Sequence, residues 1–140
     1  MSNPQEFVTL MPFAAALGVR VISASSEEVT GYLEWAPERT TAGGAVHGGA
    51  LMAFADSVGA LCAYLNLAPN TATSTTSSST VFLRAVRAGT LTAVAVPLHV
   101  GRTSIVVRTE LRDDEGRLAA QVTQTQAVLG AAAEPVVRSM

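Results

Sequence analysis

The sequence has little charge and almost no cysteine. Charged residues make up 14% of its 140 positions, and the formal net charge is −2. Such a chain offers no basic field to nucleic acid or to an anionic membrane, so neither is expected as a partner. The one cysteine, Cys62, excludes an intrachain disulfide and fits a reducing compartment.

A leader-like start and a long apolar run are also missing. Residues 1–13 contain no basic segment followed by an apolar core, so no secretory signal is expected. The most apolar segment is interrupted by Asp56, and its uninterrupted part is too short to span a bilayer. We therefore expect a soluble, cytoplasmic protein.

Motifs for several kinds of catalytic site are absent. His47, His99 and Cys62 are the available nitrogen and sulfur ligands, and their spacing matches no metal site. No GxSxG motif points to a serine triad, and no Lys-Ser/Thr pair follows the glycines of GGAVHGG as it would in a phosphate-binding loop. We expect neither a metal nor a cofactor.

Apolar residues are abundant, at 49% of the chain with a mean hydropathy of +0.34. A chain of this length fits one domain, which we assign to residues 1–140, and the excess of apolar residues suggests surface hidden in an oligomer. Within the domain we expect an N-terminal helical segment over about residues 4–17. We expect a frayed tail over about residues 131–140.

Apolar periodicity predicts the remaining elements. Residues 19–24 and 29–35 alternate across a turn and predict two strands, and a long helix follows from about Gly48 to Asn66. After Thr71 only strand patterns occur, beginning with a Thr-rich run that favours a pleated sheet with a hydroxylated face. The four later strands have short links and are expected to be antiparallel neighbours.

The long helix is apolar nearly all round, so it must be covered on most sides. We therefore expect an α+β architecture in which a curved antiparallel sheet of five to six strands wraps around one long central helix.

One carboxylate, Asp56, interrupts this apolar helix, and Gly48 stands at its start beside His47. The first amides of a helix lack intrahelical acceptors and carry the positive end of its dipole, so Gly48 offers an oxyanion site that a carbonyl can approach closely. Asp56 is a candidate general base or nucleophile. The alternative is a structural role, in which Asp56 caps a neighbouring loop or pairs with an arginine.

Gly48 and Asp56 are eight residues apart, which is about 12 Å along one helix. One carbonyl cannot contact both groups. Two antiparallel helices from two subunits can set Gly48 of one against Asp56 of the other, so the spacing itself predicts a dimer. For His47, a structural role in holding the turn is favoured over proton transfer, and Cys62 is interpreted as a packing residue.

The residues around this helix resemble a known family. GGAVHGGALMAFADSVGA, followed by VFLRAVRAGTLTAVAVPLHVGRTS and a last alternating strand, is similar to the hotdog-fold acyl-CoA thioesterases of the PaaI-like branch, named for phenylacetate degradation. The similarity covers about residues 17–129. The diagnostic feature is His-Gly-Gly with an acid nine residues after the histidine.

The resemblance implies that Asp56 is the catalytic acid position, that the Gly48 N–H is the donor to the thioester oxygen, and that coenzyme A is the carrier and part of the substrate. It also implies a homodimer or homotetramer. Family members often carry Asn or Gln where this chain has Thr41, which departs from the pattern. Further site candidates are His47 in the catalytic group and six residues for substrate binding: Gly49, Thr75, Ser77, Arg84, Arg87 and Arg102.

Two classes of function fit these features. The first is a thioesterase that hydrolyses an aromatic or short- to medium-chain acyl-CoA to free coenzyme A and a carboxylic acid. The alternative is a hotdog protein that binds acyl-CoA without turnover, as a sensor or carrier. Asp56 separates the two, because a pure binder has no use for a carboxylate at the reacting centre.

Overall fold

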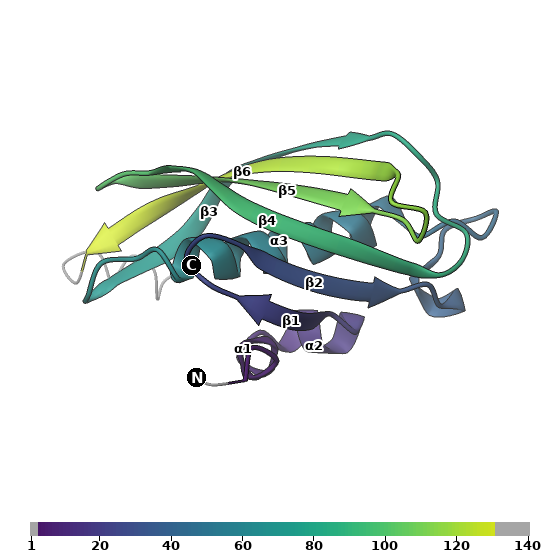
Figure 1. Ribbon diagram of the computed structural model, residues 1–140, viewed down its shortest axis with the longest axis horizontal. Coiled ribbons are helices and arrows are strands. Elements are labelled where there is room, and N and C mark those ends of the chain that lie inside the picture. Colours follow the sequence, from purple (N-terminus) through teal and green to yellow (C-terminus); the bar gives the residue numbers. More distant parts are fainter. Residues whose placement is uncertain (1–2, 131–140) are drawn as a thin grey trace.

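Six strands form one antiparallel sheet in the computed structural model, which describes residues 3–130. The sheet order is β1-β2-β4-β5-β6-β3, and every pairing is antiparallel. The sheet curves around one long helix, as expected from the sequence (Figure 1). The strand bounds are β1 Arg20–Ala24, β2 Val29–Glu34, β3 Thr71–Phe82, β4 Thr90–Val100, β5 Ser104–Arg112 and β6 Leu118–Gly130.

The long helix, α3, spans Gly48–Tyr64 and packs one face against the sheet. Phe54 and Val58 on that face are fully buried. The opposite face is open: Met52 is 42% exposed and Tyr64 is 55% exposed. The expected curved sheet around one long helix is confirmed, and within a single chain it covers one side of the helix and leaves the other side open.

The N-terminal helical segment is split in two at a proline. Helix α1 spans Glu6–Thr9, and α2 spans Pro12–Leu17 with Pro12 in its first turn, where its missing N–H has no helical acceptor to lose. Gly18 then ends α2 with φ +97°, a conformation that glycine adopts without strain. A short 3₁₀ helix, η1 at Pro37–Arg39, follows β2.

Strand β3 does not pair with β4, although only residues 83–89 separate the two. It crosses to the far side of the sheet and pairs with β6, which makes it an edge strand (Figure 1). The expectation that all four later strands would be sequential neighbours is wrong for this pair, and it holds for β4, β5 and β6. The crossover places the Ser/Thr-rich strand beside α3.

The core is built mainly from small and β-branched side chains, and the helix approaches the sheet closely. At Gly31 on β2, a Cβ atom would lie 2.9 Å from the Arg20 carbonyl oxygen and 3.0 Å from Val58 of α3. Three polar residues are also buried, Thr109, Gln124 and Gln126.

Among residues 3–130, no helix has both the length and the apolarity needed to cross a membrane. The expected frayed tail lies outside the described residues.

Candidate active site

The start of α3 is capped by a side chain that the sequence marks only as a histidine beside a turn. His47 is the N-cap residue, and its Nδ1 accepts a hydrogen bond from the Gly49 N–H at 2.8 Å. A Cβ at Gly49 would lie 2.9 Å from the same Nδ1, so glycine leaves room for this cap. Because Nδ1 is the acceptor, Nε2 carries the proton in the neutral ring.

The Gly48 amide is left without an acceptor at this helix start. The His47 carbonyl accepts from Ala50 and Leu51, and within residues 3–130 no group accepts the Gly48 N–H. A groove of about 390 Å³ opens beside it, lined by Ala45, Val46, Gly48, Leu51, Phe82, Leu83, Arg84 and Ala85. The free N–H and the helix dipole make this groove suited to an oxygen that develops negative charge.

Asp56 lies on the open face of α3, not inside the core of one chain. Its Oδ1 accepts hydrogen bonds from Thr75 Oγ1 at 3.2 Å and from Gln124 Nε2 at 3.1 Å. Among the described residues no donor reaches Oδ2. The carboxylate is thus held through one oxygen, and the other is free of hydrogen bonds from the described residues.

The hydroxyl facing Asp56 comes from Thr75, and a strand irregularity explains why Ser77 does not take this place. Thr75 pairs with Gln126 on β6, the register then shifts, and Ser77 pairs with Thr125. Since side chains alternate between faces, Ser77 shares the face of Thr125, away from the buried glutamine. Of the two residues proposed from the sequence, the structure brings Thr75 to the carboxylate and leaves Ser77 on the other side.

Two buried glutamines at this site were missed in the sequence. Gln124 bonds Asp56 directly, and Gln126 Nε2 donates to Thr75 Oγ1 at 2.6 Å. Both lie on the buried face of β6, the same face that carries Ala120 and Val122. The signal that could have identified them is a polar residue at a position of an alternating strand where the pattern predicts a buried apolar one.

Thr41 lies in the loop that leads into α3. Its N–H donates to the Ala45 carbonyl at 2.9 Å, and Thr40 and Val46 form an isolated bridge that closes the loop. Its exposed side chain makes no hydrogen bond to another residue within 3–130. The structure therefore places Thr41 near the helix start but not in contact with Asp56.

The three arginines proposed for substrate binding lie in three different places. Arg84 borders the Gly48 groove, and Arg102 lines a cavity with Asn66 beyond the other end of α3. Arg87 borders a polar cavity of about 320 Å³ with the β5–β6 turn, residues 113–117. Within one chain, only Arg84 is beside the free amide.

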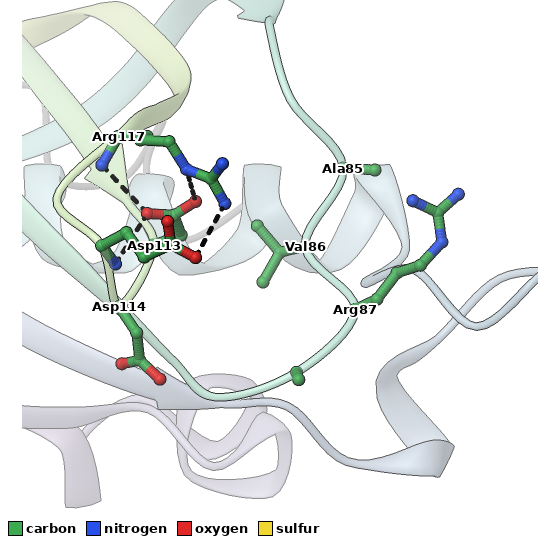
Figure 2. Close-up of a pocket in the computed structure, with 8 residues that line it drawn as sticks. Ala85, Val86, Arg87, Asp113, Asp114 and Arg117 are labelled. Atoms are coloured by element: carbon green, nitrogen blue, oxygen red, sulfur yellow. Dashed lines mark hydrogen bonds and ion pairs between the residues drawn. The ribbon is translucent and has the colours of Figure 1, made fainter.

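Figure 2 shows that Arg87 points away from the acidic turn in this cavity. Asp113 there is held by the backbone N–H of Arg117, which lowers the pKa of its carboxyl, and by the Arg117 guanidinium at 2.9 Å. The neighbouring Asp114 accepts from the Thr90 N–H at 3.2 Å. These carboxylates therefore serve the turn and repel phosphate, so this cavity does not suit a nucleotide.

An apolar cavity of about 250 Å³ lies along α3 from Asp56. It is lined by Phe7, Leu10, Met11, Ala60, Leu61, Tyr64 and Thr73. Ala60 and Tyr64 follow Asp56 by one and two turns on the same helix face. The cavity is therefore positioned to receive an apolar group attached to a carbonyl that Asp56 contacts.

Other reactive groups take no part in this arrangement. Cys62 is fully buried, and burial raises the pKa of its thiol to about 11, so it is protonated and unreactive at neutral pH. No group of three His, Cys, Asp or Glu side chains within residues 3–130 could hold a metal ion.

Residues 43–120 match the family model of the thioesterase superfamily, from the loop before α3 into β6. The chain belongs to the thioesterase superfamily. Its six-stranded sheet and long helix are the hotdog fold of that family of thioester hydrolases.

Individual relatives agree with this assignment. The proofreading thioesterase EntH of Cronobacter sakazakii is 33% identical over 87 residues, which cover 62% of this chain and 64% of that protein. A mutant of thioesterase PA1618 from Pseudomonas aeruginosa has a TM-score of 0.84 at 26% identity, over 92% of this chain and 96% of its own. Thioesterase HI1161 from Haemophilus influenzae, at 23% identity and a TM-score of 0.85, shares the fold over 93% of this chain and 90% of that one. The alignments to curated relatives span from 50% to 82% of their length.

The cap at His47 gives a testable prediction. His47→Ala removes the acceptor for the Gly49 N–H and should lower the free energy of unfolding by about 0.5–2 kcal/mol, whereas His47→Asn supplies another cap acceptor and should stay near the parent. Urea unfolding of the two variants measures this difference. Normal stability with lost hydrolysis in His47→Asn would instead make the ring a proton-transfer group.

Proposed function

We propose that this protein hydrolyses acyl-CoA thioesters, with Asp56 and the Gly48 N–H as the two reacting groups. The observation that carries the proposal is the state of Asp56: one carboxylate oxygen is bonded to Thr75 and Gln124, and the other is open. A free helix-start amide at Gly48 supplies the matching donor for the carbonyl oxygen. These are the two groups that thioester hydrolysis requires.

Two routes use this geometry. In the first, Asp56 Oδ2 takes a proton from water while the water oxygen attacks the thioester carbonyl, and the carbon–sulfur bond then breaks. In the second, Oδ2 attacks the carbonyl itself and forms a mixed anhydride, which water then hydrolyses. In both, the Gly48 N–H stabilises the oxyanion, and the coenzyme A thiolate leaves and takes up a proton.

The site is proposed to form between two copies of the chain. Strand β3 is an edge strand of 12 residues without a charged residue or a proline, although natural edges are usually protected by such residues. The two apolar residues at its end, Val81 and Phe82, are 55% and 51% exposed. Antiparallel pairing of two β3 strands about a two-fold axis would cover this edge and the open face of α3.

The acyl group is proposed to be aromatic or of short to medium length. The apolar cavity beyond Asp56 supports this proposal, since its lining is almost wholly apolar and Phe7 and Tyr64 meet edge to face with ring centroids 6.1 Å apart. Its volume of about 250 Å³ suits a compact acyl group. The resemblance to the PaaI-like branch implies the same substrate range.

Coenzyme A is proposed as the carrier, and Arg84 is the cation nearest the Gly48 groove for its phosphates. The alternative function, binding of acyl-CoA without turnover, leaves the open oxygen of Asp56 unexplained. A panel of acyl-CoA esters assayed by free-thiol release, with the matching N-acetylcysteamine thioesters that lack the nucleotide, tests both the reaction and the carrier.

Asp56→Asn is the variant that distinguishes hydrolysis from binding. Asparagine keeps an oxygen that can accept from Thr75 and Gln124, so the free energy of unfolding should change by less than about 0.5 kcal/mol, as for an exposed position. It cannot act as a base or nucleophile, so kcat should fall by roughly 10² to 10⁴ while acyl-CoA still binds. Parental turnover in the folded variant would rule out Asp56 as the reacting group.

Gly48→Pro tests the amide donor. Proline lacks the N–H, is well tolerated at the first helical position, and follows a His47 backbone whose ψ of 136° suits a residue before proline. Loss of one oxyanion donor should lower kcat by about 10² to 10³. Gly48→Ala is the matched control, because it keeps the N–H and its Cβ would meet only the Phe82 ring at 3.4 Å. Equal activity of the two variants would mean that the amide is not the donor.

A further inference from the structure

The buried polar residues behind Asp56 form a directed hydrogen-bond chain. Thr73 Oγ1 donates to Gln126 Oε1 at 3.0 Å, which fixes the orientation of that amide. Gln126 Nε2 then donates to Thr75 Oγ1 at 2.6 Å. Because the Thr75 oxygen is already an acceptor, its single proton is available for Asp56 Oδ1, at 3.2 Å.

Gln124 adds a second donor to the same carboxylate oxygen. Its side chain is completely buried, and its Nε2 lies 3.1 Å from Asp56 Oδ1. Both donors come from the sheet behind α3, and both select Oδ1. Donors on the sheet thus fix the orientation of the carboxylate, and Oδ2 remains available to the substrate.

Helix α3 makes room for this amide at Gly59. A Cβ atom at Gly59 would overlap Gln124 Oε1, so no other residue fits opposite the glutamine as it is placed. Glycine within a helix costs about 1 kcal/mol relative to alanine. The position of the Gln124 amide therefore explains a glycine that the helix would otherwise disfavour.

The other end of the Gln124 amide has no hydrogen bond. Its Oε1 is buried without a partner, and so is the Oγ1 of Thr109, which lies 3.2 Å from the position of a Gly59 Cβ. A buried polar atom without a partner costs about 1–3 kcal/mol. An apolar side chain of similar size would suit this part of the core better, so stability does not explain Gln124.

We propose that Gln124 is a positioning residue: it holds Asp56 Oδ1 so that Oδ2 faces the thioester or its attacking water. The proposal rests on the proposed function, in which Asp56 is the reacting group. Gln126 acts on Asp56 indirectly, through its hydrogen bond to Thr75. Gln124 itself does not contact the substrate, and its effect passes through the orientation of the carboxylate.

Gln124→Met tests this role, with Gln124→Leu made in parallel so that the packing of one side chain does not decide the result. Both remove the donor to Asp56 and the unpartnered oxygen. We expect kcat to fall by about 10- to 100-fold, as for a misplaced reacting group, with KM within about twofold and an unchanged or higher melting temperature. Thr109→Val is the matched control, since it removes the neighbouring unpartnered oxygen without touching Asp56 and should leave kcat unchanged.

A double-mutant cycle with Asp56→Asn tests whether the effect passes through the carboxylate. In single-turnover measurements, adding Gln124→Met to Asp56→Asn should cause little further loss, because the group being positioned is already gone. Parental kcat in folded Gln124→Met, unfolding of both Gln124 variants, or a full additional loss in the Asp56→Asn background would each overturn the proposal. Parental turnover of Asp56→Asn alone would instead overturn the proposed function.

Discussion

The rigid spacing along α3 is the constraint on which the proposed site depends. Gly48 and Asp56 are eight residues apart, which is about 12 Å along the axis of one helix, and the Asp56 side chain is too short to span that distance. A carbonyl that contacts both groups must therefore take them from two different helices. In the dimer proposed above, the same requirement would account for two otherwise costly features of the single chain, the open face of α3 and the unprotected edge at β3.

The strand order supplies the residues that hold the Asp56 carboxylate. By crossing to β6 in place of β4, strand β3 brings Thr75 beside Asp56 and places its partner Gln126 on the neighbouring strand. The edge strand thus supports the carboxylate on one side and offers a pairing surface on the other. In the proposed dimer, the same 12 residues of β3 would link the chemistry to the assembly.

Local patterns were sufficient to predict much of the fold. Alternation located the strands, and the glycines beside His47 located the start of α3. Pairing of β3 with β6 was not predicted, because sheet order depends on contacts between residues far apart in the chain. The open face of α3, on which Asp56 lies, could not be predicted, since an apolar helix face that the chain leaves uncovered has the same composition as one that packs in its own core. Thr75 could not be separated from Ser77 because the register shift between them reverses the alternation.

Complementation between two inactive variants tests most directly whether the site is shared. Gly48→Pro and Asp56→Asn are unfolded and refolded together in equal amounts, and the hydrolysis of the best acyl-CoA ester is measured. If each site takes Gly48 from one chain and Asp56 from the other, half of the dimers carry one intact site, and the mixture should recover about a quarter of the parental activity. A mixture that forms mixed dimers but remains as inactive as its components would contradict the account.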